Sequence, residues 1–379
     1  MKLNDIAEFV TDKISSSGIS LDRYVTTDSL LQNRRGRETA QNLPPMPCAL
    51  THYRQGDVLV ANIRPYLKKV WYADSEGGCS SDVLAFRAKK GHCPSFLYTV
   101  LMQDAFFDYA MSGAKGSKMP RGDKDQIMRY ELPTFTPMEE ENIGNMMVEI
   151  MSKIKVNRQI NDNLEAMAKQ LYDYWFVQFD FPNEEGKPYK SSGGAMVWNE
   201  KLKRELPKGW DFCFLENLLT IKNGRDHKHL ADGIYPVYGS GGEMRKASEY
   251  LYDGESVLMP RKGSLNNIMY VNEAFWTVDT MFYSEIKQSN CAKYIYYTIK
   301  DIDFTRWDSG TGVPSMTSST LYSIKLVKPQ SEILKKFDEV ISPLFEHMKQ
   351  ISEQNSVLTK QRDELLPLLM NGQASVNSD

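Results

Sequence analysis

Residues 139–176 read EEENIGNMMVEIMSKIKVNRQINDNLEAMAKQLYDYWF. Two rows of mostly apolar residues recur in this stretch every seven positions, and the rows lie three or four residues apart. The rows are Met147, Ile154, Asn161, Ala168 and Trp175, and Ile143, Ile150, Asn157, Leu164 and Leu171. This spacing is typical of a coiled-coil seam, and chance rarely sustains it over several heptads. The sequence therefore predicts a long helix that pairs with another helix.

A second stretch with the same pattern begins at residue 331 and runs to residue 370. Its rows are Phe337, Leu344, Ile351, Leu358 and Leu365, and Ile341, Met348, Asn355, Arg362 and Leu369. Polar residues stand within both seams, and such residues lower stability but fix register and orientation. Pro343 predicts a kink or a restart in this helix. We expect the two helices to pair antiparallel; the alternative is two unrelated amphipathic helices, each packed on its own domain.

The sequence before each helix is repeated at low fidelity. SGAKGSKMP (residues 112–120) is echoed by SGTGVPSMT (residues 309–317). At one common offset, Ser112, Gly113 and Met119 fall on Ser309, Gly310 and Met316. Each copy then reaches a proline through a strand-like stretch, YELPTFTP (130–137) and YSIKLVKP (322–329), before its helix begins. A globular module followed by a long helix, present twice, predicts an α+β protein with two similar α/β heads and pseudo-twofold symmetry.

Size and composition agree with two soluble domains. The chain has 379 residues, enough for two domains that each bury a core. It has no apolar run near the ~20 residues that span a bilayer, and its amphipathic N-terminus is unlike a signal peptide. The five cysteines are scattered without a C-x-x-C pair, which is typical of reduced thiols in a cytoplasm. We therefore expect a cytoplasmic protein with no membrane partner.

The net charge of −3 conceals local basic clusters in glycine- and aromatic-rich parts of both heads. Local basic patches, more than total charge, decide whether a surface binds phosphate. The candidate DNA contacts are Arg64, Lys68, Lys69, Lys115, Lys118 and Arg121 in the first head, and Arg225, Lys228, Arg245, Arg261, Lys262, Asn266 and Arg306 in the second. For any one cluster, an ordinary solvated surface is the alternative.

Two short motifs in the second head sharpen this hypothesis. RKGSLNN (residues 261–267) offers donors that suit guanine or adenine edges, beside a hydroxyl for phosphate. GSGG (residues 239–242) allows close backbone approach, either to a DNA phosphate or within a tight turn. In contrast, we expect Met119 and Met316 to fill the core.

Motifs for catalysis are absent or incomplete. The sequence contains no G-x-x-x-x-G-K-[ST] phosphate loop and no N-P-P-Y-type or D-P-P-Y-type methyltransferase motif. His227 and His229 lack a third metal ligand at a suitable spacing. Asp279 with Glu285 and Lys287 resembles a nuclease arrangement only faintly, and a turn followed by a surface strand is the preferred interpretation. The sequence predicts neither catalytic residues nor a metal site.

Several motifs, taken in order, resemble one family. They are LYDYWFVQFDFP (171–182), ELPKGW (205–210), IKNGRDH (221–227), YPVYGSGGE (235–243), VLMPRKGSLNN (257–267), FWTVDTMFY (275–283) and RDELLPLLMNG (362–372). Together they resemble the specificity (S) subunits of type I restriction–modification systems, over nearly the whole chain. Residues 1–47 match only a general strand-and-loop pattern.

The resemblance implies a division of the chain and a role for each part. Residues 1–138 and 205–330 would be target recognition domains, 139–182 and 331–372 the conserved helices, 183–204 a linker and 373–379 a tail. Each domain would read half of a bipartite double-stranded DNA target. The first helix, roughly 55 Å long at ~1.5 Å per residue, would set the unread gap. The alternatives are part of a fused type II restriction–methylation enzyme, or a helical scaffold that does not bind DNA.

The resemblance also implies partners, while this chain would hold no cofactor and no active site. Two modification subunits would bind S-adenosylmethionine and methylate adenine N6. Restriction/translocase subunits would use ATP and Mg²⁺. We expect contacts with these partners at Tyr172, Trp175, Phe176, Leu365 and Leu369. For the LYDYWFV stretch, the alternative is that it attaches the helix to its own domain.

Overall fold

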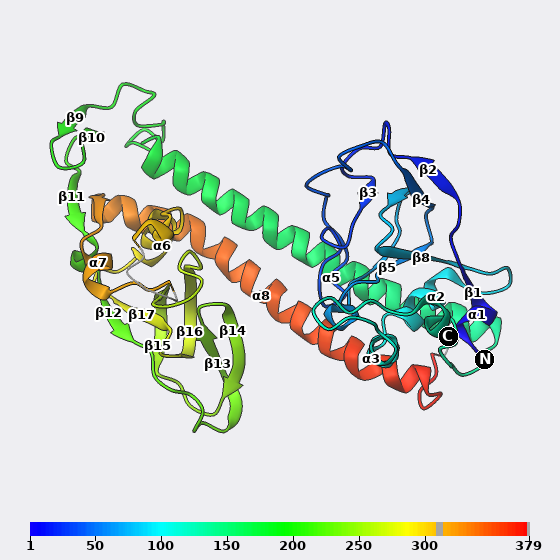
Figure 1. Ribbon diagram of the computed structural model, residues 1–379. Coiled ribbons are helices and arrows are strands. Elements are labelled where there is room, and N and C mark those ends of the chain that lie inside the picture. The colour runs from blue at the N-terminus through cyan, green and yellow to red at the C-terminus, as the bar shows by residue number, and fades with distance from the viewer. Residues whose placement is uncertain (308–313, 377–379) are drawn as a thin grey trace. The chain divides into compact units, whose positions relative to one another are not determined.

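The computed structural model describes residues 1–307 and 314–376, and the fold is α+β, as predicted (Figure 1). The chain forms two compact units. Unit 1 comprises Met1–Asn161 and Gln350–Asp379, and unit 2 comprises Asp162–Lys349. Each unit contains one head and part of each long helix. Within the described residues, none of the helices combines the length and the apolar character needed to cross a bilayer.

The head of unit 1 contains two four-stranded sheets, with strand orders β1-β8-β5-β6 and β2-β4-β7-β3. Helix α2 begins with a proline, which suits the first helical position, and its apolar residues are buried beside Phe86 and Val58. The elements are α1 (Leu3–Ile6), β1 (Ala7–Phe9), β2 (Lys13–Ser15), β3 (Tyr24–Val25), β4 (Ala49–Tyr53), β5 (Val58–Ala61), η1 (Pro65–Leu67), β6 (Val70–Tyr72), β7 (Gly77–Cys79), β8 (Val83–Ala88), α2 (Pro94–Leu101), α3 (Asp104–Ser112) and α4 (Lys124–Ile127).

The head of unit 2 contains a six-stranded sheet of order β12-β17-β15-β16-β13-β14 and two two-stranded sheets. The elements are η2 (Asp173–Val177), β9 (Met196–Asn199), β10 (Arg204–Pro207), β11 (Asp211–Phe214), η3 (Leu215–Asn217), β12 (Leu219–Asn223), β13 (Asp232–Gly239), β14 (Gly242–Ala247), β15 (Tyr252–Pro260), β16 (Met269–Thr277), β17 (Met281–Ile286), α6 (Ala292–Lys300), η4 (Phe304–Trp307), α7 (Ser318–Tyr322) and β18 (Lys325–Lys328). The segment predicted as a linker thus includes β9, which pairs antiparallel with β10.

The repeat predicted from the sequence is present in the sheets. The order β1-β8-β5-β6 in unit 1 matches β12-β17-β15-β16 in unit 2, and every neighbouring pair is antiparallel. The registers also match, since Val60 opposes Leu84 where Met259 opposes Phe282. A buried helix, α2 or α6, follows the sheet in each unit. The two heads therefore share one scaffold.

The alignment of the two methionines, however, is wrong. Gly122 donates its backbone N–H to the Asn62 carbonyl, and Met316 donates in the same way to Arg261. Met316 thus corresponds to Gly122 and not to Met119. Met316 is 3% exposed, as expected of a core residue, whereas Met119 is 50% exposed, so its predicted core position is wrong. Ser309 and Gly310 lie outside the described residues.

Two long helices follow the heads, α5 (Pro137–Tyr172) and α8 (Ser331–Met370). The N-terminus of α5 is capped reciprocally: Thr136 N–H donates to Glu139 over 2.7 Å, and Glu139 N–H donates to the Thr136 hydroxyl over 3.3 Å. The predicted restart at Pro343 is wrong, because α8 runs through this residue without a break. Pro343 is exposed between the seam residues Ile341 and Leu344, whose packing supports the helix there.

The predicted seam is present, and its polar residues pair with one another. In unit 1, Asn157 is 1% exposed and donates to Gln354 over 2.7 Å and to Asn355 over 3.0 Å. Further along α5, Asn161 donates to Ser352 over 3.0 Å. As the residue numbers rise along α5, the residue numbers of the partners in α8 fall, so the helices run antiparallel in this unit. An amide pair buried in an apolar seam is satisfied in one register only, which favours this alignment.

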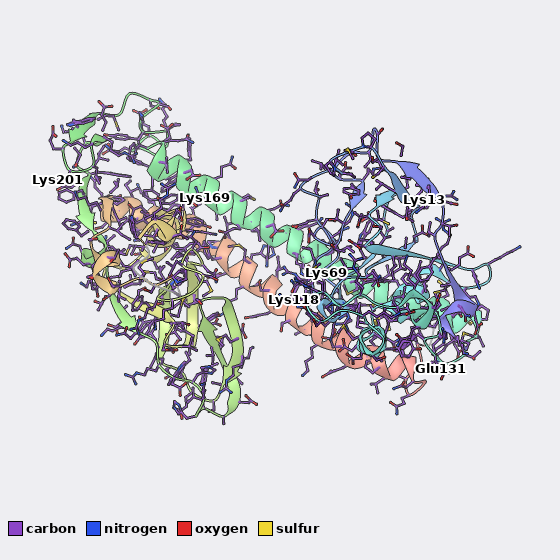
Figure 2. All side chains as sticks on the ribbon, viewed as in Figure 1. Lys13, Lys69, Lys118, Glu131, Lys169 and Lys201 are labelled. Carbon is purple, nitrogen blue, oxygen red and sulfur yellow. The ribbon has the colours of Figure 1, made fainter. Side chains whose placement is uncertain are left out.

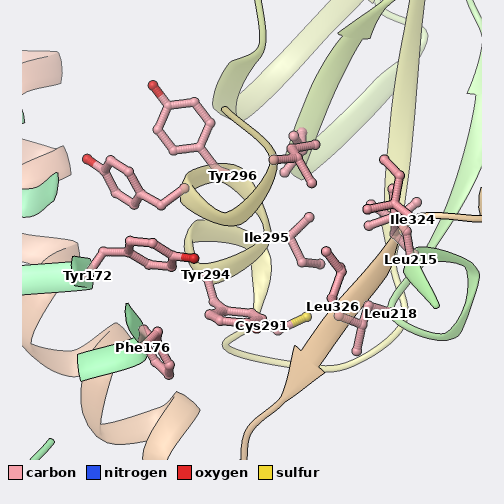
Figure 3. Close-up of a cluster of buried hydrophobic side chains, with 14 of the residues drawn as sticks. Tyr172, Phe176, Leu215, Leu218, Cys291, Tyr294, Ile295, Tyr296, Ile324 and Leu326 are labelled. Atoms are coloured by element: carbon pink, nitrogen blue, oxygen red, sulfur yellow. The ribbon is translucent and has the colours of Figure 1, made fainter. Parts of the chain in front are cut away.

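The core of unit 2 forms where the C-terminal end of α5 meets the head (Figure 3). Tyr172 and Phe176 face helix α6, with ring centroids of Phe176 and Tyr294 4.7 Å apart. Leu215 and Leu326 lie on the other side of α6. From α8, Phe337 packs edge-on against Phe176 at 4.8 Å. Aromatic side chains therefore attach both long helices to this head.

Candidate nucleic-acid interface

In unit 2, four motifs found in the sequence meet at the turn between β16 and β17. Gly224 and Arg225, which follow β12, donate backbone N–H groups to Met281 over 3.1 Å and to Thr277 over 2.9 Å. A Cβ atom on Gly224 would lie 2.0 Å from the Val278 carbonyl oxygen, so only glycine fits there. The IKNGRDH motif is therefore fixed against FWTVDTMFY.

The other two motifs join the same turn. Arg261 and Lys262 donate backbone N–H groups to the Thr280 carbonyl over 2.8 and 3.2 Å. Val278 N–H donates to Tyr238 over 3.0 Å, which brings in the YPVYGSGGE motif. The Asn267 side chain then donates to the Ser240 carbonyl over 2.9 Å. The GSGG motif thus forms the tight turn between β13 and β14, where Gly239 pairs with Gly242.

Three cationic side chains remain available at this end of the head. Arg225, Lys228 and Lys262 are exposed and form no ion pair with any residue that the structure describes. Arg261 is half-buried, and its guanidinium lies 6.0 Å from the ring centroid of Phe282. The exposed cations are free to interact with an anionic ligand.

The other predicted contacts of unit 2 are engaged within the chain. Arg245 donates to the carbonyls of His227 and Leu230 over 3.2 and 2.6 Å. Asn266 accepts from Phe304 N–H over 2.8 Å and donates to Asp303 over 3.2 Å. Arg306 pairs with Asp303 over 3.1 Å. Hydrogen bonds from Thr305 and Asn266 lower the pKa of Asp303, which keeps its carboxylate charged and these partners occupied.

In unit 1, the loop between β5 and β6 is equivalent to the loop between β15 and β16 in unit 2. Arg64 N–H donates to the Pro120 carbonyl over 2.8 Å, as Gly263 N–H does to Pro314 over 2.9 Å in unit 2. This bond joins the loop to a hairpin closed by two Lys115–Arg121 backbone bonds of 2.9 Å. Lys118 stands within the hairpin (Figure 2). Arg64 and Lys118 are both exposed, and neither has an ion-pair partner among the described residues.

The remaining basic residues predicted in unit 1 bind groups of their own head. Lys115 pairs with Asp123 and Arg121 with Asp82, each over 3.1 Å. Lys68 lies 2.6 Å from Asp104. Lys69 donates to the Thr27 carbonyl, and burial lowers the pKa of its ammonium group. These side chains fix the loop and the hairpin to their head, whereas Arg64 on the loop and Lys118 on the hairpin are exposed.

Residues 207–355 match the family model described as type I restriction modification DNA specificity domain. The chain is 24% identical over 371 residues to the MjaIX specificity subunit of Methanocaldococcus jannaschii, covering 90% of this chain and 83% of that protein. It is 19% identical to the HindI specificity subunit of Haemophilus influenzae, covering 98% of both. This chain is similar to type I specificity subunits over most of its length.

The fold of this chain is also found in a solved structure. The S subunit of a type I restriction–modification system from M. genitalium superposes with a TM-score of 0.64 at 16% identity. The match covers 98% of this chain and 95% of that one. The shared fold therefore extends over both heads and both long helices.

The fold buries most of the residues expected to contact partners. Tyr172, Trp175 and Phe176 are buried in the core of unit 2, and Leu369 is buried in the core of unit 1. Leu365 is partly buried against that same core. The structure thus gives the LYDYWFV stretch the other role considered from the sequence, attachment of the helix to its own domain. Aromatic residues at a helix end suit either role, and only the fold distinguishes them.

Three residues of the nuclease and metal hypotheses have other partners in the fold. Glu285 pairs with Lys222 over 3.4 Å, and the Lys287 ammonium donates to the Glu216 carbonyl over 2.6 Å. The His229 ring lies edge-on to Trp276. Over residues 1–307 and 314–376, no three His, Cys, Asp or Glu side chains gather as a metal site would require.

Two further arginines of this head, Arg34 and Arg37, are not among the predicted contacts and pack within the head. Arg34 is 6% exposed and bonds both Asp104 and the Met102 carbonyl, which supports the loop beneath Lys68. Arg37 lies over Trp71 with its guanidinium carbon 4.4 Å from the ring centroid. The NRRGR run (residues 33–37) was a detectable signal, since arginines beside a glycine are typical of a turn that carries charge.

Proposed function

We propose that this specificity subunit reads a bipartite double-stranded DNA sequence, one half-site with each head. The observation that carries the proposal is the convergence of four motifs on the turn of residues 277–281, which leaves Arg225, Lys228 and Lys262 exposed around it. The same scaffold exposes Arg64 and Lys118 in the first head. Free cations beside rigid loops suit contacts to phosphates and to base edges in the major groove.

In this proposal the subunit contributes recognition and assembly, and its partners contribute chemistry. Two modification subunits would bind S-adenosylmethionine and methylate adenine N6 within the target. Restriction/translocase subunits would use ATP and Mg²⁺ to cut unmethylated DNA. The relatives' names, specificity subunits of type I restriction enzymes, support this assignment.

Salt dependence tests whether the exposed cations contact phosphate. Each phosphate contact releases condensed counterions, so removing one is expected to reduce the slope of log affinity against log salt by about 0.9. Lys262→Ala and Arg225→Ala should each weaken DNA binding by the chain assembled with its modification subunit, and should flatten this slope. The measurement is fluorescence anisotropy of a labelled duplex over a salt series.

Lys201→Ala is the matched control, because Lys201 is exposed in the β9–β10 turn, outside the motif cluster (Figure 2). This variant should keep both the affinity and the slope. A slope that is flat for the unaltered chain, or a loss equal in Lys201→Ala and Lys262→Ala, would contradict phosphate contact at this end of the head.

A further inference from the structure

Arg64 has an unusual backbone conformation for its residue type. Its φ of 53° and ψ of 62° are left-handed, and it directly precedes Pro65. A side chain with a Cβ atom disfavours this region, and a residue before proline favours an extended backbone. Such conformations persist where the surroundings hold them, and they cluster at functional sites.

The surrounding backbone holds the Arg64 loop from both sides. Arg64 N–H donates to Pro120, and Leu67 N–H donates back to the Arg64 carbonyl over 2.9 Å. Leu67 and Lys68 then accept backbone N–H groups from Asn33 and Arg34, each over 2.9 Å. Because the buried Arg34 also bonds Asp104, the loop is fixed to the body of the head. The direction of the Arg64 Cα–Cβ bond is therefore set by the fold.

The second head has a different residue at the backbone position equivalent to that of Arg64. Gly263 occupies the equivalent position, with a φ of +91°. A Cβ atom there would lie 2.8 Å from the Ser240 hydroxyl oxygen, so the β13–β14 turn fills that space. Glycine is the ordinary residue for this conformation. The first head instead keeps an exposed arginine against the preference of its backbone, on a scaffold that the two heads share.

We propose that Arg64 is a specificity-determining residue of the first head and reads a guanine. The inference rests on the proposed function, since it assumes that this head reads DNA. A flexible lysine on an exposed hairpin, such as Lys118, is sufficient for phosphate. A rigid loop that fixes the start of a guanidinium side chain suits the bidentate bonds that arginine makes to guanine O6 and N7. The different residue at the equivalent position of the second head lets the two heads prefer different bases.

Selection from a duplex library tests this inference. The chain, assembled with its modification subunit, is used to enrich randomised DNA, and the sequences bound by each variant are compared. Arg64→Gly is expected to lose a preference of about tenfold or more for one G·C pair in one half-site. Arg64→Lys keeps the charge but not the planar fork, so it should lose the same preference while keeping the salt slope.

Two controls separate specificity from folding and from charge. Arg64→Gly should unfold at a temperature no lower than the unaltered chain, with a rise of about 2–4 °C from relief of the left-handed conformation. Lys90→Ala removes an exposed charge from the turn after β8, away from the loop, and should leave the selected sequence unchanged.

Several results would overturn the inference. One is an unchanged preference at every position in Arg64→Gly and Arg64→Lys while binding persists. Another is a uniform loss of affinity on all sequences, as for a phosphate contact. A lower unfolding temperature of Arg64→Gly would remove the premise of strain. If the unaltered chain enriches no sequence, the proposed function itself fails, and that result is distinct from the others.

Discussion

Exchange of residues 206–328 for the matching domain of a type I specificity subunit is expected to change one half of the methylated sequence and to leave the other half unchanged. The physical reason is that unit 2 has its own hydrophobic core and its own motif cluster. No residue of the first head belongs to either. Methylome sequencing of a host that carries the exchanged chain measures both half-sites and the gap at once.

The exchange needs a donor domain that fits the helices left in place. Tyr172 and Phe176 from the end of α5 would pack against the incoming α6, and Phe337 from α8 packs edge-on against Phe176. A donor that keeps aromatic residues at the positions of Tyr294 and Tyr297 is therefore the sharpest choice, and thermal unfolding checks that the chimera folds. Simultaneous change of both half-sites in a folded chimera would show that the heads are not independent.

Insertion of one heptad into each long helix is expected to lengthen the unread gap by about three base pairs. Seven helical residues add about 10 Å, and DNA rises ~3.4 Å per base pair. The insertions belong after Asn161 in α5 and after Lys349 in α8, where the two compact units divide. Contacts within each unit, such as Asn157 to Asn355 and Lys300 to Glu165, then remain as they are. Methylome sequencing again gives the result.

The design includes its own control. In the control, the seven residues are inserted into α5 alone. The added helical turns of α5 then have no partner in α8, so this variant should unfold at a lower temperature or fail to assemble. An active double insertion that methylates the original spacing would show that helix length does not set the gap. If the double insertion changed the half-sites themselves, this would contradict the claim that the heads read the bases and the helices set only the gap.

The long helices were predictable because their signal is local and periodic. The seven-residue rows found from the sequence are buried or half-buried in the structure, and Asn157 pairs with Asn355 as polar residues in facing seams should. The second head was also predictable at the level of motifs, since glycines such as Gly224 stand where no Cβ fits. The continuity of α8 through Pro343 was not predictable from the sequence, because helix packing offsets the free-energy cost of a proline inside a helix.

The sites were harder to predict because charge pairing is a tertiary property. Lys68 and Arg121 were counted as DNA contacts, yet Asp104 and Asp82 lie tens of residues away in sequence and bind them in the fold. Nothing in the spacing of these residues identifies the pairs. The same limit applies to Met119 and Met316, whose shared identity suggested an equivalence that the backbone hydrogen bonds contradict.

Enrichment of random duplex DNA by the chain, assembled with the proposed modification subunit, is the most direct test of the central claim. Two heads built on one scaffold should enrich two short specified blocks, separated by a fixed number of unspecified base pairs. The pattern should persist when the salt concentration is raised, although total binding falls. A single continuous block, or no enrichment over non-specific DNA, would contradict the account.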